Sequence, residues 1–140
     1  MELKMDVAEL EAFLARDFPQ VGDMFSILEV GAGTLKVRLN VRDEHLRPGG
    51  TVSGPTMFAL ADVGIYLAVL AVIGPVGLAV TTNCSIDFMR KPLAGVDLIA
   101  ECRILKLGRV LAVGDVLIYS EGDARPVARA SMTYSIPPSG

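Results

Sequence analysis

A long apolar run, from Met57 to Val80, constrains this chain more than any other feature, because Asp62 is the single charged residue in it. Length and composition alone would allow a membrane-spanning helix. Asp62, the break at Gly74-Pro75 and the lack of basic flanks argue against one, since a carboxylate near the centre of a span costs roughly 2.5–3.5 kcal/mol on insertion scales. We therefore predict no membrane association, and a helix over 54–73 that is buried on all sides of a folded domain.

Short elements with clear periodicity surround this helix. An amphipathic helix is predicted within residues 1–18, because Val7, Leu10 and Phe13 recur at helical spacing after Asp6, a suitable N-cap. Alternating apolar and polar residues predict a first hairpin over 24–41 and the remaining strands over 78–137, with Gly and Pro in their connections.

The strand after the central helix has two distinct faces by simple alternation. One face is expected to carry Val80, Thr82, Cys84, Ile86 and Phe88, and the other to carry Thr81, Asn83, Ser85 and Asp87. An antiparallel sheet that carries one apolar helix buries that helix only by curling around it. The order of elements therefore predicts a single α+β domain over 1–140 with the hotdog fold: an antiparallel sheet curled around one long central helix, preceded by a short N-terminal helix.

Composition excludes several classes of function. A net charge of −3 and a pI of about 5.1 give no electrostatic footprint for nucleic acid. Cys84 and Cys102 lack the spacing of metal or redox motifs, and no clustered ligand set predicts a metal site. The acidic N-terminal residues do not resemble a signal peptide, so a cytoplasmic location is expected. An apolar fraction of 51% in a chain of 140 residues indicates that subunit contacts bury part of the surface.

Four segments carry a resemblance to a known family: GGTVSGPTMFALAD, AVTTNCSIDFMRKPLAG, LKLGR and VARASMTYSI. In this order and spacing they resemble the phenylacetate-degradation (PaaI-type) thioesterases of the hotdog fold, over roughly residues 20–137. Family members typically have a loop like HLNPxGTVHGG, a helix with an acidic residue, and a strand that begins VT. The resemblance implies an acyl-CoA thioesterase (a hydrolase of EC 3.1.2 type) that forms a homodimer or a dimer of dimers, a homotetramer.

The match assigns residues one by one. Gly54 falls on the first Gly of the HGG motif, Asp62 on the helix carboxylate and Thr81 on the polar residue that opens the next strand. Arg47 stands where Asn is usual and Ser53 where His is usual. Pro55 replaces the second Gly. These departures concern the mechanism rather than the fold.

Thioester hydrolysis needs a donor for the developing oxyanion and a base or nucleophile for the carbonyl carbon. Gly54 begins the helix, where unpaired N–H groups and the macrodipole favour negative charge, so its N–H is the expected oxyanion donor. A simple helix cap over Ser53-Gly54-Pro55 is the structural alternative. A carboxylate on an apolar helix needs a partner or a purpose, and Asp62 is expected to act as a general base or as a nucleophile. A purely structural Asp62 is the alternative.

The spacing of the two groups predicts an oligomer. Gly54 and Asp62 are eight residues apart, which is about 12 Å along a helix axis. One chain therefore does not easily aim both groups at one carbonyl. Two antiparallel helices related by a twofold axis would bring Gly54 of one subunit beside Asp62 of the other, with two composite sites per dimer.

Other polar residues are expected to orient water or substrate. Ser53 has no activating base, because the one histidine, His45, lies on a loop eight residues earlier, so a Ser-His-Asp triad is not expected. Ser53 and Thr81 are candidate orienting hydroxyls, with capping and strand-surface roles as alternatives. Arg47 is a candidate for binding a carboxylate or phosphate, or for pairing with Asp62 across the interface; a solvated loop Arg is the alternative.

Candidate substrate contacts fall into two groups. A pocket for an aromatic or a medium-chain acyl group would be lined by Phe58, Ile65 and Tyr66. The phosphates of coenzyme A would be bound by an exposed cluster of Arg90, Lys91, Lys106 and Arg109, each of which could equally be an ordinary surface charge. No cofactor is expected, because coenzyme A is part of the substrate.

Two other functions remain open from the sequence. A hotdog hydratase or dehydratase generally pairs its carboxylate with a histidine, and no histidine follows Asp62. A non-catalytic protein that binds acyl-CoA or a small ligand is favoured by the altered positions Arg47 and Ser53. Asp62 argues against it, because binding alone does not need a buried carboxylate.

Overall fold

The computed structural model describes residues 1–75 and 79–138, and its element order is the predicted one. The described residues form two helices and six strands in the order α1 (Val7–Asp17), β1 (Phe25–Gly31), β2 (Thr34–Leu39), α2 (Gly54–Ile73), β3 (Val80–Phe88), β4 (Leu98–Leu107), β5 (Leu111–Ser120) and β6 (Pro126–Ser135). A 3-10 turn, Asp43–His45, lies in the loop before α2.

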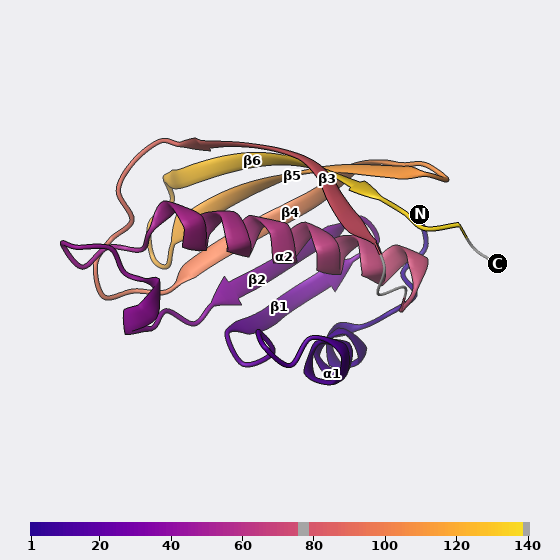
Figure 1. The fold of residues 1–140 in the computed structure, drawn as a ribbon, viewed down its shortest axis with the longest axis horizontal. Coiled ribbons are helices and arrows are strands. Elements are labelled where there is room, and N and C mark those ends of the chain that lie inside the picture. The colour runs from indigo at the N-terminus through magenta and orange to yellow at the C-terminus, as the bar shows by residue number, and fades with distance from the viewer. Residues whose placement is uncertain (76–78, 139–140) are drawn as a thin grey trace.

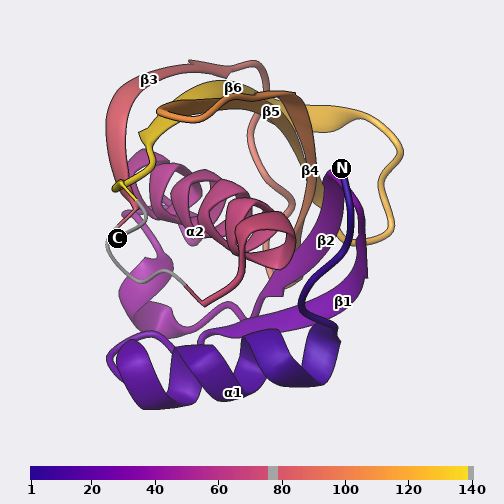
Figure 2. The same cartoon turned by 90° about the vertical axis from the view of Figure 1, so that its right-hand side faces the viewer.

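The six strands form one antiparallel sheet in the order β1-β2-β4-β5-β6-β3. The sheet curls around α2, and α1 lies on the opposite side of α2 from β3 and β6 (Figures 1 and 2). This is the α+β hotdog architecture, so the predicted fold is confirmed. Strands β1 and β3 are the two edges of the sheet.

Local sequence sets the limits of α2. Ser53 caps its first turn, where Pro55 loses no hydrogen bond because the N–H groups there have no helical acceptor. The helix ends at Gly74, whose φ of 94° lies in the left-handed region that favours glycine. Gly64 lets the helix approach the sheet closely, because a Cβ at this position would lie 2.5 Å from Sγ of Cys102 in β4.

The sheet does not cover α2 on all sides, and in this respect the prediction is wrong. By length and composition α2 would be able to cross a membrane, yet 61% of its most apolar window is buried inside the fold. A stripe at helical spacing stays partly or fully exposed: Pro55, Phe58, Ala59, Asp62 and Val63. A sheet curled around a helix leaves one side open, and the stripe on that side includes the one charged residue of the helix.

Helix α1 is fixed by both local and tertiary contacts. The carboxylate of Asp6 accepts a hydrogen bond from the N–H of Glu9 at 2.9 Å, and the carboxylate of Glu9 accepts one from the N–H of Asp6, which completes a capping box. Its apolar face, with Leu10, Phe13 and Leu14, is buried. The end of α1 is therefore held in a defined position beside α2.

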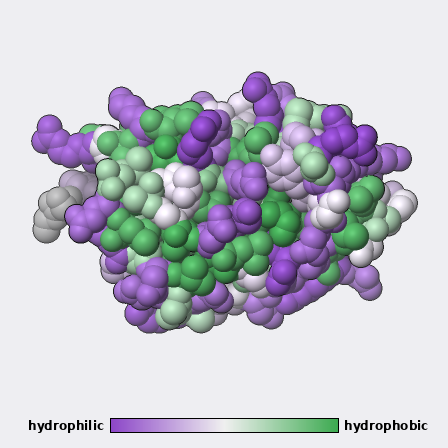
Figure 3. All heavy atoms as spheres, turned by 180° about the vertical axis from the view of Figure 1, so that it is seen from behind, coloured by the Kyte–Doolittle hydropathy of each residue, from purple (hydrophilic) through white to green (hydrophobic). Residues whose placement is uncertain are grey.

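The outer face of the sheet is turned away from α2 and mixes apolar with charged side chains (Figure 3). Leu105 and Leu117 are exposed there, and they line a hollow together with Asp87 and Arg129. Ion pairs such as Arg129 with Asp87, at 2.8 Å, join neighbouring strands on this face.

Candidate functional site

Asp62 lies on the open stripe of α2 and is held by two hydroxyl groups from the sheet. The hydroxyl of Thr81 in β3 donates to Oδ1 of Asp62 at 2.5 Å. The phenol of Tyr134 in β6 lies 2.5 Å from the same Oδ1 and 2.7 Å from the main-chain oxygen of Asp62. Distances near 2.5 Å are typical of O–H donors to a carboxylate.

The two oxygens of this carboxylate have different environments. Both hydroxyl donors contact Oδ1, whereas Oδ2 receives no hydrogen bond from residues 1–75 or 79–138. Because Oδ1 fixes the orientation of the group, Oδ2 remains able to accept a proton or to attack. This division between a held oxygen and a free oxygen is what a general base or a nucleophile requires.

A β-bulge in β3 brings Thr81 to Asp62. The pairing of β3 with β6 shifts register between Thr81 and Asn83, so Thr82 is the extra residue. As a result Thr81 faces α2 together with Cys84, and simple alternation, which assigned them to opposite faces, is wrong here. Burial raises the pKa of the Cys84 thiol, and the nearby carboxylate of Asp62 raises it further.

Tyr134 is a site residue that the sequence did not single out. It is 2% exposed, and burial, followed by its hydrogen bond to Asp62, raises its pKa well above the ordinary value of a phenol. It is therefore a neutral donor at physiological pH. The sequence did hold one signal for Tyr134. It follows the apolar Met132 by two residues, which places both on the helix-facing side of β6, and a buried tyrosine there needs a hydrogen-bond partner.

A cavity of about 510 Å³ opens beside Asp62. Its lining residues come from α1, α2, β3, β6, the segment after α1 and the residue before β3: Asp17, Phe18, Gln20, Asp62, Val63, Tyr66, Ala79, Val80, Thr81 and Tyr134. Asp62, Thr81 and Tyr134 thus lie together on a cavity whose remaining wall is apolar or aromatic except for Asp17 and Gln20. This combination is typical of a pocket for a mostly apolar ligand with one reactive polar group.

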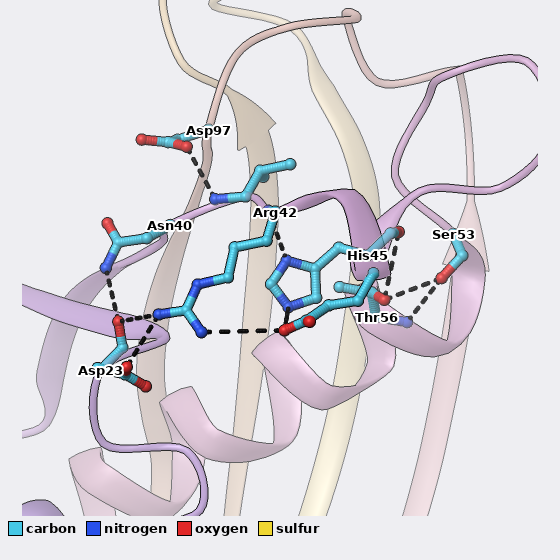
Figure 4. Close-up of polar contacts among 9 residues, drawn as sticks. Asp23, Asn40, Arg42, His45, Ser53, Thr56 and Asp97 are labelled. Carbon is cyan, nitrogen blue, oxygen red and sulfur yellow. Dashed lines mark hydrogen bonds and ion pairs between the residues drawn. The ribbon is translucent and has the colours of Figure 1, made fainter.

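The start of α2 is fastened by a loop that contains His45 (Figure 4). The main-chain oxygen of His45 accepts from the N–H of Ser53 at 2.9 Å, and Nδ1 of His45 accepts from the N–H of Arg42 at 2.9 Å. The proton of the neutral imidazole therefore lies on Nε2. Oγ of Ser53 accepts from the N–H of Thr56 at 3.3 Å and contacts Oγ1 of Thr56 at 2.9 Å. Ser53 is a helix cap, and within the described residues it is not paired with the imidazole.

Gly54 presents a main-chain donor at this end of the helix. Its N–H has no acceptor among the described residues, and the ring of Phe88 covers the position that a Cβ would occupy, at 3.3 Å. A second cavity, of about 350 Å³, lies here, and three of its lining residues are cations: Arg47, Arg90 and Lys91. An unpaired N–H at a helix start, on a cavity that three cations also line, suits an anionic ligand.

The remaining candidate residues are distributed differently from the prediction. Lys106 and Arg109 line a separate hollow at the β4–β5 turn. This turn lies near the start of β3, because Val80 of β3 and Leu111 of β5 both pair with Ser135 of β6. Arg90 follows the other end of β3, about 30 Å away at 3.3 Å per residue. The four cations therefore do not form a single cluster in one protomer.

The three predicted acyl contacts also differ from one another. Tyr66 lines the cavity beside Asp62. Phe58 is exposed on the open stripe of α2. Ile65 is fully buried and packs on Gly114 of β5, where a Cβ would lie 2.7 Å from its Cδ1, so it belongs to the core.

The two halves of the predicted site stay apart within one chain. Asp62 lines one cavity and Gly54 lines the other, and the two share no lining residue. Among residues 1–75 and 79–138 no group of three or more His, Cys, Asp or Glu side chains could hold a metal ion. The site thus consists of a carboxylate beside an apolar cavity and, separately, a cationic cavity at a helix start.

Comparison with known proteins gives the family. The model of the Thioesterase superfamily matches residues 49–127. The crystal structure of a candidate thioesterase from Silicibacter sp. TM1040 is 60% identical, with a TM-score of 0.93 and coverage of 99% of this chain and 96% of that chain. The phenylacetic acid degradation protein PaaI of Thermus thermophilus is 30% identical, with a TM-score of 0.72 and coverage of 85% and 99%. Human acyl-coenzyme A thioesterase 13 is 26% identical over 120 residues, 85% of this chain and 84% of the human protein.

Proposed function

Because the chain belongs to the Thioesterase superfamily, whose members hydrolyse thioesters, we propose that it is an acyl-CoA thioesterase with Asp62 as its catalytic carboxylate. The observation that carries this proposal is the environment of Asp62. Two hydroxyl donors hold Oδ1, while Oδ2 is free of described donors beside an apolar cavity of about 510 Å³. The cavity suits an aromatic or a short to medium acyl group.

The proposed reaction balances without a cofactor. In the general-base form, Oδ2 of Asp62 takes a proton from water as the water oxygen attacks the thioester carbon, and the carbonyl oxygen becomes negative. The N–H of Gly54 donates to that oxygen. The C–S bond then breaks, the proton passes to the coenzyme A thiolate, and a free acid is released. In the nucleophilic form Asp62 attacks the thioester carbon, the C–S bond breaks to release coenzyme A thiolate, and water hydrolyses the resulting anhydride to the free acid and the Asp62 carboxylate.

The proposed site is formed by two protomers. Asp62 and Gly54 lie about 12 Å apart along one helix, and an antiparallel copy would bring Gly54 and its cations to the partner's Asp62. Exposed apolar side chains on the open side of the fold support this contact: Phe58 on α2, and Val80 and Phe88 on the edge strand β3. An uncovered sheet edge also favours pairing with a second copy. The apolar and charged outer face of the sheet (Figure 3) is a further surface on which two such dimers could associate.

Charge supports coenzyme A as the leaving group. Arg47, Arg90 and Lys91 surround the Gly54 cavity and would face the phosphates, while the acyl group would enter the partner's less cationic Asp62 cavity. A solved neighbour from Streptococcus mutans, 25% identical with a TM-score of 0.72 over 81% of this chain and 89% of that chain, was crystallised with acetyl CoA.

A release assay on a panel of acyl-CoAs tests the proposal. Purified protein should liberate coenzyme A thiol from at least one aromatic or aliphatic acyl-CoA, and the rate should persist in excess chelator. Asp62→Asn should remove that activity without changing oligomer size. The alternative is a non-catalytic acyl-CoA-binding protein, which the departures at Arg47 and Ser53 favour. Tight binding with no thiol release from any acyl-CoA would establish that alternative.

A further inference from the structure

The cavity beside Asp62 has a wall that comes from a distant part of the chain. Asp17, Phe18 and Gln20 follow or end α1, yet they line the same cavity as Thr81 and Tyr134. Figure 2 shows α1 on one side of α2, with β3 and β6 on the other. The reactive carboxylate is therefore held from the β3 and β6 side, and the segment after α1 bounds the cavity from the opposite side.

The backbone of Phe18 is held at the end of α1. It is the C-cap residue of α1, and its N–H donates to the oxygen of Leu14 at 2.9 Å. Leu14 is 1% exposed, and Phe13 packs on Tyr66 with ring centroids 6.4 Å apart. Since Tyr66 follows Asp62 by one turn of α2, this contact ties the end of α1 to the helix that carries the carboxylate.

The cavity changes in character between its two sides. The side of Asp62, Thr81 and Tyr134 is rich in hydrogen-bonding groups. Away from it, Val63, Tyr66 and Phe18 offer apolar surface, with the polar side chains of Asp17 and Gln20 beside Phe18. An acyl group whose carbonyl carbon lies at Asp62 would extend along Tyr66 toward the ring of Phe18.

We propose that Phe18 is a specificity-determining residue, whose ring closes the acyl cavity and limits the length of the acyl chain. This inference rests on the proposed function, because it takes the cavity beside Asp62 as the acyl site. It assigns the N-terminal helix, which lies before the matched family segment 49–127, a role in substrate selection.

Two substitutions of opposite size test the proposal. Phe18→Ala enlarges the cavity and Phe18→Trp reduces it, and Phe18 is 40% exposed, so neither change opens the core. Leu28→Ala is the matched control, because Leu28 is also 40% exposed, and it lies on β1 outside the cavity lining. The substrates are butanoyl-, hexanoyl-, octanoyl- and decanoyl-CoA, and the readout is kcat/KM for each.

Relative to the wild type, Phe18→Ala should raise the ratio of kcat/KM for decanoyl-CoA over butanoyl-CoA at least about fivefold, roughly the effect of one or two buried CH₂ groups. Phe18→Trp should lower the same ratio, and Leu28→Ala should leave it unchanged. Equal ratios in all four proteins would overturn the role of Phe18, even if Asp62→Asn abolishes turnover as proposed.

A binding measurement separates this inference from the proposed function. Dissociation constants of the same four acyl-CoAs are measured by calorimetry for the wild type and both Phe18 variants. If no protein releases thiol but the affinity series shifts with the size of residue 18, the hydrolase proposal fails and the cavity assignment stands. If neither rates nor affinities respond to residue 18, the cavity assignment fails.

Discussion

The phenol of Tyr134 and the carboxylate of Asp62 lie 2.5 Å apart, although 72 residues separate them in the chain. Tyr134 is buried and stays neutral, so it acts as a fixed donor rather than as a titrating group. Thr81 donates to the same oxygen. The strands β3 and β6 thus determine which oxygen of Asp62 is held and which has no described donor, so the sheet sets the orientation of the carboxylate on the helix.

Asp62→Asn should lower kcat by at least about 100-fold, the scale expected for removal of a general base. The amide oxygen can still accept from Tyr134 and Thr81, but the group can neither take a proton from water nor attack the carbonyl. Steady-state rates on the best acyl-CoA measure the effect. Thermal unfolding and sedimentation must accompany them, since loss of folding or of the oligomer would favour a structural Asp62.

Ser53→Ala serves as the comparison for that substitution. Oγ of Ser53 bonds to Thr56 and has no described base beside it, so a smaller fall in kcat is expected. Loss of this N-cap should lower the free energy of unfolding by about 1 kcal/mol. A Ser53→Ala variant that is inactive, beside an active Asp62→Asn variant, would require a serine acyl-enzyme instead.

Tyr134→Phe should reduce both stability and turnover. The variant loses a donor to a carboxylate, a contribution of about 1.5–3 kcal/mol, and leaves Thr81 as the remaining described donor to Oδ1. We expect kcat to fall about tenfold, because the carboxylate is less firmly oriented. Tyr119→Phe is the control: Tyr119 interacts with Glu101 away from the cavity, so kcat should not change. A fully active Tyr134→Phe variant would show that Thr81 alone orients Asp62.

Burial of the Tyr134 phenol predicts a loss of stability at alkaline pH. Its folded pKa is raised, so above about pH 10 the unfolded chain releases a proton that the folded chain keeps, and the free energy of unfolding falls with pH, by up to about 1.4 kcal/mol per unit. Burial also raises the pKa of the Cys102 thiol, which contributes to the same loss of stability at alkaline pH. Denaturant unfolding at pH 8 and pH 10.5 should therefore show a smaller decrease for Tyr134→Phe than for the wild type. Equal decreases would contradict the inferred burial.

The parts of the structure that the sequence predicts have local causes. The bounds of α2 follow from Ser53 and Pro55 at one end and Gly74 at the other. The cap of α1 follows from Asp6 and Glu9. Asp62 is conspicuous because a charge in an apolar run is costly. Each of these signals acts within a few residues, and a single sequence is enough to identify them.

The parts that the sequence does not predict depend on pairing between distant segments. The direction of Thr81 is set by a register shift against β6, which alternation within β3 does not reveal. Tyr134 becomes a site residue only because β6 lies over α2. Phe18 reaches the cavity through packing of α1, and Ile65 faces Gly114 rather than a pocket. In each case tertiary contacts override the local pattern.

Gly54→Pro tests the main-chain oxyanion donor. Proline removes the N–H but is tolerated at a helix start, and Ser53 already has the extended conformation that precedes a proline, with φ −75° and ψ 158°. Loss of one oxyanion donor should lower kcat about 100-fold or more. Gly54→Ala adds a Cβ against Phe88 but keeps the N–H, so its loss should be much smaller. Equal losses would attribute the effect to crowding at Phe88.

Mixing the two inactive variants tests whether two protomers form each site. If Asp62 of one chain works with Gly54 of the other, a mixed dimer of Asp62→Asn and Gly54→Pro has one site with both defects and one site with neither. Random exchange of equal amounts makes half of the dimers mixed, so about a quarter of the wild-type sites are restored. Activity should therefore rise toward a quarter of the wild-type rate after the proteins are mixed under conditions that allow subunit exchange. A site within one chain predicts no rise, because every chain then carries one of the two defects. Chemical cross-linking of each variant before mixing should abolish the recovery.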